Sequence, residues 1–271
     1  MSLYDDGENV PFSTEFVKWR SGWCHQAEYQ GRNVPDVNAR IDALLKLWRV
    51  PVPGNWQRAI DSQLLGRRYR RGDVGAPHNG EHRIEHEMLA DPIADVRCMG
   101  VMVDDGINAM PLVHDETGGR SANVEADVLL LLRDGRSHRL ALLEVKYDAD
   151  NPWYAAVENL LQVKLLSANR EQRRLFHARR PVALLDEDLP VVGLVVAPLE
   201  YYRSPGQKSL AVQPAQRLHD RFRRELGVDL HLATWDAVAR AVTPHRGRLT
   251  DRGRWERADR MCGCTRENPA G

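Results

Sequence analysis

Two carboxylates and one lysine flank two neighbouring apolar runs of this 271-residue chain. Asp127 precedes the run Val128 to Leu132, and Glu144 and Lys146 end the run that begins at Leu140. Carboxylate oxygens are the ligands that Mg²⁺ prefers, and the ion keeps several waters of its own. A lysine beside such an ion can orient or deprotonate a nucleophilic water and bind a phosphate. The spacing therefore predicts phosphodiester hydrolysis.

The lysine at position 146 stands out because the chain uses arginine almost everywhere. Its 38 basic residues include only five lysines, which are Lys18, Lys46, Lys146, Lys164 and Lys208. Arginine keeps its charge in proteins, whereas burial or neighbouring groups can lower the pKa of a lysine. The choice of lysine favours a chemical role over a generic charge. A plain salt bridge at the end of a strand is the alternative.

The two apolar runs are expected to pair as a β-hairpin. Asp134 and Gly135 lie between them and form a strong turn signal. Side chains alternate across a strand, so Glu144 and Lys146 should share one face. The run Val128 to Leu132 is apolar throughout, which is typical of a strand covered on both sides. We therefore expect the three polar residues at the end of a buried hairpin.

A helix should follow the hairpin directly. Asn151 is a good N-cap and Pro152 suits the first helical position, so a helix is predicted over 153–169. Glu158 and Gln162 are four residues apart and neighbour each other on its surface. This helix can therefore present polar groups near the end of the hairpin.

The remaining elements are predicted from apolar periodicity and turn residues. They are a helix over 81–89 that carries Glu81, Glu85 and Glu87, a buried strand over 191–197, a helix over 214–226 and a short strand over 228–234. The predicted order is helix, two or three strands, helix, strand, helix, strand.

With this order and these motifs, the chain resembles the PD-(D/E)XK nuclease superfamily over roughly residues 78 to 235. The resemblance implies an α/β fold with a restriction-endonuclease-like mixed β-sheet core of order α-β-β-β-α-β, flanked by helices. It also implies a Mg-dependent endo- or exonuclease that hydrolyses phosphodiester bonds. Mg²⁺ is then the expected cofactor, with Mn²⁺ as a substitute.

The resemblance also implies a metal-binding set. Asp127 and Glu144 would bind one or two Mg²⁺ ions, and Val145 is assigned to the same set. Members often add a glutamate from the first helix, for which Glu85 is the choice and Glu81 the reserve.

The other catalytic residues follow from the same resemblance. Lys146 would assist the attacking water, and Gln162 matches the polar residue that many members carry on the following helix. The chain departs from the motif at Ala126, where the family name has proline. Glu125 lies two residues from Asp127 on the same predicted strand face, and is either a further ligand or a decoy.

Charge is balanced overall but uneven along the chain. The net charge is +2 over 1–75, −7 over 76–199 and +5 over 200–271. Basic flanks can hold a phosphate backbone, so nucleic acid, with DNA preferred, is the expected partner. The candidate contacts are the run Arg67 to Arg71 and the set Arg246, Arg248, Arg252, Arg254, Arg257 and Arg260. Such runs face solvent as often as they contact a substrate. The sequence leaves open whether the chain forms a homodimer.

Three parts are expected along the chain: a helical N-terminal lobe over 1–75, the nuclease-like core over 76–243 and an arginine-rich tail over 244–271. In the lobe, helices are predicted over 37–48 and 56–65. The stretch Gly72 to Gly80 is the linker candidate. Trp19, Trp23, Trp48 and Trp56 either pack this lobe or stack on bases.

No apolar stretch approaches the length of a membrane span, and no signal segment begins the chain, so a cytoplasmic protein is expected. Cys24 and Cys98 are isolated in the sequence. Cys262 and Cys264 are too close together for the usual zinc spacing and suggest a free thiol tail.

Three functions are weighed. The first is the Mg-dependent nuclease, for which Glu144→Ala or Lys146→Ala should abolish cleavage and leave the fold intact. The second is a catalytically inactive nucleic-acid-binding or assembly module on the same fold, against which the intact Asp, Glu and Lys argue. The third is an unrelated α/β hydrolytic enzyme, for which the chain has no nucleophile elbow, phosphate loop or zinc-protease motif.

Overall fold

The computed structural model of the chain describes residues 19–23, 36–52, 80–90, 95–103, 106–113, 124–170, 173, 189–245, 249 and 255. The helix predicted over 56–65, the linker before Gly80, the run Arg67 to Arg71 and the C-terminal arginines lie outside these residues. So do Trp56 and the cysteines at 24, 262 and 264.

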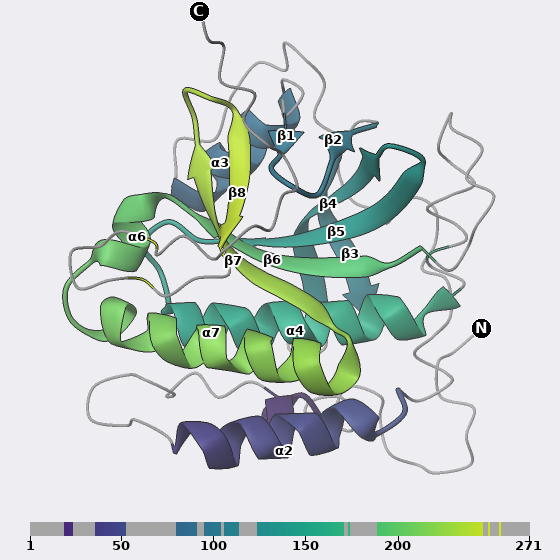
Figure 1. Cartoon of the computed structure of the whole chain (residues 1–271), viewed down its shortest axis with the longest axis vertical. Helices are drawn as coiled ribbons and strands as arrows, with labels where there is room; N and C mark the ends of the chain where they lie inside the picture. The colour runs from purple at the N-terminus through teal and green to yellow at the C-terminus, as the bar shows by residue number, and fades with distance from the viewer. Residues whose placement is uncertain are drawn as a thin grey trace, which may run out of the picture.

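A mixed β-sheet forms the centre of the molecule (Figure 1). Its described strands are β1 Asp95–Val96, β2 Val101–Met102, β3 Ile107–Val113, β4 Val124–Asp134, β5 Ser137–Val145, β6 Val191–Ala197, β7 Asp229–Asp236 and β8 Ala241–His245. The strand order is β1-β8-β7-β6-β5-β4-β2, and β3 also pairs with β4. Strands β3, β4 and β5 are antiparallel, whereas β5, β6 and β7 are parallel. The α/β class predicted from the sequence is therefore confirmed.

Helices cover both faces of the sheet. On one face lie α4 Pro152–Ala168 and α7 Gln207–Leu226, with α2 Val37–Arg49 packed outside them (Figure 1). On the other face lies α3 Gly80–Ala90, and the short helix α6 Leu199–Arg203 precedes α7. Within the described part of the chain, no helix is both long and apolar enough to cross a membrane.

Strand β4 divides its side chains between two hydrophobic cores. Leu129 and Leu131 join the core beneath α4 and α7, whereas Val128, Leu130 and Leu132 join the core that includes α3. The alternation follows from the period of two residues along a strand. Burial of each side chain stabilises the fold by about 1.5–3 kcal/mol. The prediction of a strand covered on both sides is confirmed.

Local sequence signals set most of the boundaries. The β4–β5 turn contains Gly135, whose φ of 59° is in the left-handed region that glycine tolerates. Strand β6 coincides with the predicted 191–197. The side chain of Asn151 caps α4 by accepting a hydrogen bond of 3.0 Å from the backbone N–H of Tyr154. These turn and cap residues place β4, β5 and α4 as predicted.

Helix α7 differs from its prediction. It begins at Gln207 rather than at Pro214, which lies inside the helix. A proline lacks the backbone N–H and favours the first turn, which is why the sequence suggested a start there. The turns on either side of it bury Ala211, Val212, Ala215 and Leu218. Burial of this apolar face outweighs the cost of the proline.

The described residues of the N-terminal region pack onto the same core as α4 and α7. Trp23, Ile41 and Leu44 are fully buried in that core. The guanidinium group of Arg40 donates hydrogen bonds to the carbonyls of Gly22 and Trp23, at 2.9 and 2.6 Å. Packing rather than base stacking is therefore the role of Trp23, while the boundaries of the lobe stay a prediction.

Cys98 lies in the turn between β1 and β2 and is disulfide-bonded. It is therefore not the isolated cysteine that its sequence surroundings suggested. Its partner is outside the described residues, because the other three cysteines of the chain are. Pairing depends on Cα distances in the fold, which cysteine spacing does not reveal.

Gly193 on β6 allows α4 to lie close against the sheet. A Cβ atom at this position would lie 2.3 Å from Asn159 Oδ1 and 2.6 Å from Leu230 Cδ2. We expect Gly193→Ala to lower the free energy of unfolding by about 1–3 kcal/mol, because the packed core must shift. Denaturant unfolding measures this, with Gly22→Ala as control, where the nearest atom is 3.2 Å away on the Leu47 side chain. Equal effects of the two substitutions would contradict it.

Candidate active site

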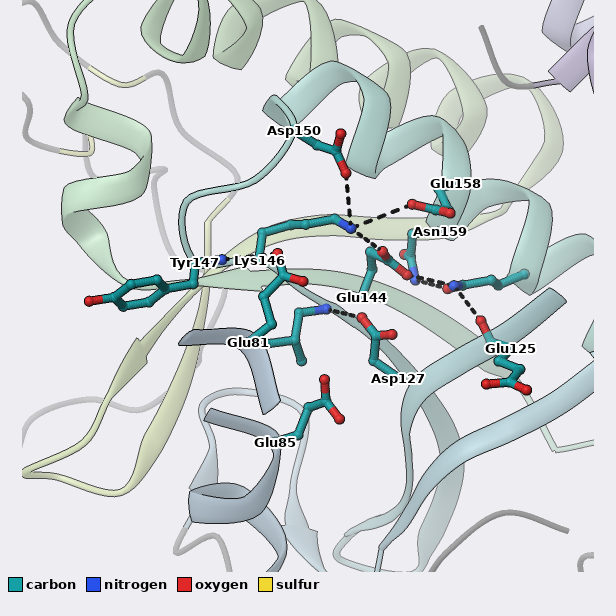
Figure 2. Close-up of polar contacts among 12 residues, drawn as sticks. Glu81, Glu85, Glu125, Asp127, Glu144, Lys146, Tyr147, Asp150, Glu158 and Asn159 are labelled. Atoms are coloured by element: carbon teal, nitrogen blue, oxygen red, sulfur yellow. Dashed lines mark hydrogen bonds and ion pairs between the residues drawn. The ribbon is translucent and has the colours of Figure 1, made fainter. Parts of the chain in front are cut away.

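The ends of β4 and β5 bring three of the predicted residues together (Figure 2). Asp127 lies on β4, Glu144 lies on β5, and Lys146 follows β5 directly. Asp127 Oδ2 accepts a hydrogen bond of 2.7 Å from the backbone N–H of Val145. The backbone N–H of Lys146 donates to the carbonyl of Val196 at 2.9 Å, which fixes the chain after β5. The register of the hairpin therefore positions the site.

Lys146 is surrounded by carboxylates. Its Nζ atom lies 2.6 Å from Glu144 Oε1. Asp150 Oδ2 and Glu158 Oε2 each lie 3.5 Å from the same Nζ atom. The Lys146 side chain is only 8% exposed. An ammonium group has three N–H donors, so it can interact with three carboxylates at once.

The pKa of Lys146 follows from these partners. Burial alone would lower it, but the negative charges of Glu144 and Glu158 outweigh burial and raise the pKa above its ordinary value. Lys146 is therefore an ammonium at neutral pH, not the lowered-pKa amine that its choice over arginine suggested. Such a group can bind a phosphate oxygen or orient a water, but it accepts no proton.

Gln162 on α4 holds the other oxygen of Glu144. Its Nε2 atom donates to Glu144 Oε2 at 2.5 Å and to the carbonyl of Glu125 at 3.0 Å. The amide of Asn159 donates to Gln162 Oε1 at 3.1 Å and to the carbonyl of Leu142 at 3.2 Å, which fixes how Gln162 is oriented. Gln162, which the sequence put forward as the polar residue of this helix, thus contacts Glu144 directly, and its role stays a prediction.

The two central carboxyl groups are short of positive charge. Burial, followed by the charges of Asp127 and Glu158, raises the pKa of Glu144 well above its ordinary value. Burial also raises the pKa of Asp127 to about 8, with a further contribution from the charge of Glu85. Lys146 lowers both pKa values but does not cancel these effects. A further cation would stabilise this arrangement.

Glu85 approaches the cluster from α3. It is buried, and its Oε2 atom accepts a hydrogen bond from the side-chain amide of Asn108. Its Oε1 atom lies 3.2 Å from Nδ1 of His82. Glu81, the reserve choice, instead accepts a hydrogen bond of 3.4 Å from the backbone N–H of Tyr147. Of the two, Glu85 is the one whose charge acts on Asp127.

Glu125 does not join the cluster. Its side chain is exposed and points away from Asp127 (Figure 2). Only its backbone carbonyl meets the site, where it accepts the hydrogen bond from Gln162. Between ligand and decoy, the geometry favours the decoy.

Two partners of Lys146 were not assigned from the sequence. Asp150 lies in the loop before α4, with a φ of 54° that is uncommon for a residue other than glycine. Glu158 lies on α4, one turn before Gln162. The signal that was present is spacing, because Asp150 is four residues after Lys146 and Glu158 is four before Gln162. Asn108 and Asn159, which orient Glu85 and Gln162, carried no such signal.

The donor chemistry of Asp127 and Glu144 suits a hard divalent cation, and burial is the main cause of their raised pKa values. Val145 contributes its backbone N–H, which donates a hydrogen bond to the Asp127 carboxylate. In the described part of the chain, no group of three or more His, Cys, Asp or Glu side chains already has a metal-binding arrangement. Metal binding would therefore use two carboxylates and other oxygens.

Comparison with known proteins finds no matching family model, no matching curated protein and no matching solved structure.

Proposed function

We propose that this chain is a Mg²⁺-dependent nuclease of the PD-(D/E)XK type that hydrolyses phosphodiester bonds in DNA. The observation that carries the proposal is the buried contact of 2.6 Å between Lys146 and Glu144, next to Asp127 at the end of one hairpin. Withdrawing two carboxylates and an ammonium from water together has a desolvation cost that their mutual attraction often fails to repay. Clusters with such perturbed pKa values are concentrated at functional sites.

The order of elements supports the proposal. Helix α3, strands β3, β4 and β5, helix α4 and strand β6 follow one another in the order α-β-β-β-α-β, with the two-residue strands β1 and β2 inserted after α3. The three candidate residues lie on the second and third of those strands, or directly after them. This is the arrangement that the resemblance to the nuclease superfamily implies for a restriction-endonuclease-like core.

Each residue has a defined task in this proposal. Asp127 and Glu144 would hold the ion, which when bound lowers the pKa of a water and stabilises charge on the phosphate. Lys146, as an ammonium, would orient the attacking water or bind a non-bridging phosphate oxygen. Gln162 keeps the Glu144 carboxylate oriented through its hydrogen bond. Glu85 adds negative charge beside Asp127 from α3.

One observation favours the alternative, an inactive nucleic-acid-binding or assembly module. Lys146 already provides Glu144 with a cation at 2.6 Å, so part of the cluster is neutralised by the protein itself. A structural role for this ion pair would need neither a metal nor a reaction. Metal-dependent cleavage separates the two functions.

The decisive experiment is cleavage of supercoiled plasmid, single-stranded DNA and RNA, each with Mg²⁺, with Mn²⁺ and with chelator. We expect metal-dependent cleavage of DNA that Glu144→Gln abolishes. Glu125→Gln, which removes an exposed carboxylate two residues from Asp127, is the matched control and should cleave normally. Cleavage that survives in Glu144→Gln, or no cleavage of any substrate by a folded wild type, would contradict the proposal.

A further inference from the structure

Three carboxylates lie within ion-pair distance of the Lys146 ammonium. Its Nζ atom lies 2.6 Å from Glu144 and 3.5 Å from both Asp150 and Glu158, and its side chain is 8% exposed. An N–H that binds a carboxylate cannot at the same time bind a water or a phosphate oxygen well. Contact between Lys146 and a substrate therefore competes with these ion pairs, and most directly with the short contact to Glu144.

Glu144 is the partner most suited to do so. One of its oxygens contacts Lys146 and the other accepts the hydrogen bond from Gln162. Both are hard oxygen donors of the kind that a divalent cation takes. A cation that binds Glu144 therefore competes with Lys146 for the same carboxylate. Release by Glu144 would leave the ammonium with Asp150 and Glu158.

Asp150 is held in place by the backbone around it. Its φ of 54° is in the left-handed region, which is sparsely populated by residues other than glycine and better tolerated by Asp and Asn. Asn151 immediately begins the cap of α4, and Lys208 donates a hydrogen bond to the carbonyl of Asp148. Backbone conformations of this kind are concentrated at functional sites.

Glu158 is also held by more than one partner. Its Oε2 atom lies 3.5 Å from Lys146 Nζ, and its Oε1 atom lies 3.9 Å from Arg20 NH2. Glu158 lies on α4, and Asp150 lies in the loop before that helix. Neither carboxylate lies on the strands that carry Asp127 and Glu144.

We propose that Asp150 and Glu158 are positioning residues that take over the Lys146 ammonium when Glu144 binds the divalent cation. They favour metal binding because Lys146 keeps two carboxylate partners after Glu144 has bound the cation. They also keep the ammonium beside the site, where the N–H that Glu144 releases becomes available to a water or a phosphate. This inference rests on the proposed function and specifies how its site is loaded.

The test is calorimetric titration of Mg²⁺ into the full-length protein without DNA. Wild type is compared with Asp150→Asn, Glu158→Gln and the double variant, all close in shape to the native side chains. Loss of groups that support metal-binding residues weakens affinity by about 10- to 100-fold, and we expect that loss for the double variant. Asp148→Asn removes one charge from the same loop and should leave affinity near that of wild type.

A second comparison separates the lysine from general electrostatics. In a Lys146→Met background, the double substitution should no longer weaken Mg²⁺ binding, because no ammonium remains to be taken over. In cleavage assays at saturating Mg²⁺, the double variant in the native background should lower kcat and leave the KM for DNA unchanged. Thermal unfolding shows that each variant is folded.

Equal Mg²⁺ affinity in wild type and the double variant would overturn the inference alone. The same would follow from a loss that Asp148→Asn reproduces or that persists without Lys146. A wild-type protein that binds no Mg²⁺ would overturn both the inference and the proposed function. The two failures are thereby distinguishable.

Discussion

Lys146→Met is expected to abolish DNA cleavage and to lower the free energy of unfolding by about 3–5 kcal/mol. Removal of one member of a buried ion pair leaves uncompensated charge, and losses of that size are typical. Here the ammonium is surrounded by Glu144, Asp150 and Glu158, so its loss leaves carboxylates that repel one another. Denaturant unfolding and plasmid cleavage measure the two effects separately.

A compensating substitution tests the cause of that loss. Glu144→Gln introduced together with Lys146→Met should recover part of the stability, because one buried charge is removed, but should not recover cleavage. Unchanged stability in Lys146→Met would contradict the importance of the ion pairs. Cleavage retained by the purified variant would contradict the catalytic role of Lys146. The sequence alone predicted an intact fold for such a variant, because it did not reveal how many carboxylates surround the lysine.

Asp127→Asn is expected to remove both cleavage and the stabilisation of the fold by Mg²⁺. A ligand that binds only the folded state raises the unfolding temperature, and this rise should disappear with the carboxylate. In chelator, however, the variant should be more stable than wild type near pH 8, because a buried charge that repels Glu144 is gone. The asparagine oxygen can still accept the hydrogen bond from the N–H of Val145.

The pH dependence of stability gives the sign of this effect. Asp127 has a pKa of about 8 in the folded protein and an ordinary value of 3.8. Between these values the folded state binds the proton more tightly than the unfolded state does. The contribution of Asp127 to the free energy of unfolding is therefore fully present below pH 3.8 and is lost as the pH rises through 8. In chelator, wild type should lose stability relative to Asp127→Asn over that range.

Thermal unfolding at a series of pH values, in chelator and in Mg²⁺, checks both parts of this prediction. Asp148→Asn serves as control, because it removes an exposed carboxylate from the nearby loop. A difference between wild type and Asp127→Asn that does not change with pH would contradict the raised pKa. A Mg²⁺-induced rise that survives in Asp127→Asn would contradict its role as a metal ligand.

Sequence reasoning succeeded where the cause is local. The Asp-Gly turn, the Asn151 cap and the apolar run of β6 each depend on a few adjacent residues, and each has its predicted place. Spacing on a strand was enough to predict that Glu144 and Lys146 share a side, and spacing on a helix brought Gln162 to Glu144. These predictions depend only on the regular spacing of residues along a strand or a helix.

Other features depend on irregular backbone or on distant packing. Asp150 lies 3.5 Å from Lys146 in a loop where its own φ is left-handed, and no spacing rule predicts such a backbone. Glu125 shares its strand with Asp127, yet its side chain lies outside the cluster. The raised pKa of Lys146 requires knowing that Glu158 approaches it from another element. Sequence also placed the start of α7 at Pro214, because local preference cannot weigh the burial that extends that helix.

The division of β4 between two cores has a consequence for insertions and deletions. Asp127 and Glu144 are separated by sixteen residues. Inserting one residue into β4 after Asp127 would reverse the face of its carboxylate relative to the rest of the strand, because successive side chains point to opposite faces. Inserting two would restore the face but move the carboxylate by roughly 7 Å along the strand. The length of this hairpin is thus constrained by strand register as strictly as any residue identity within it.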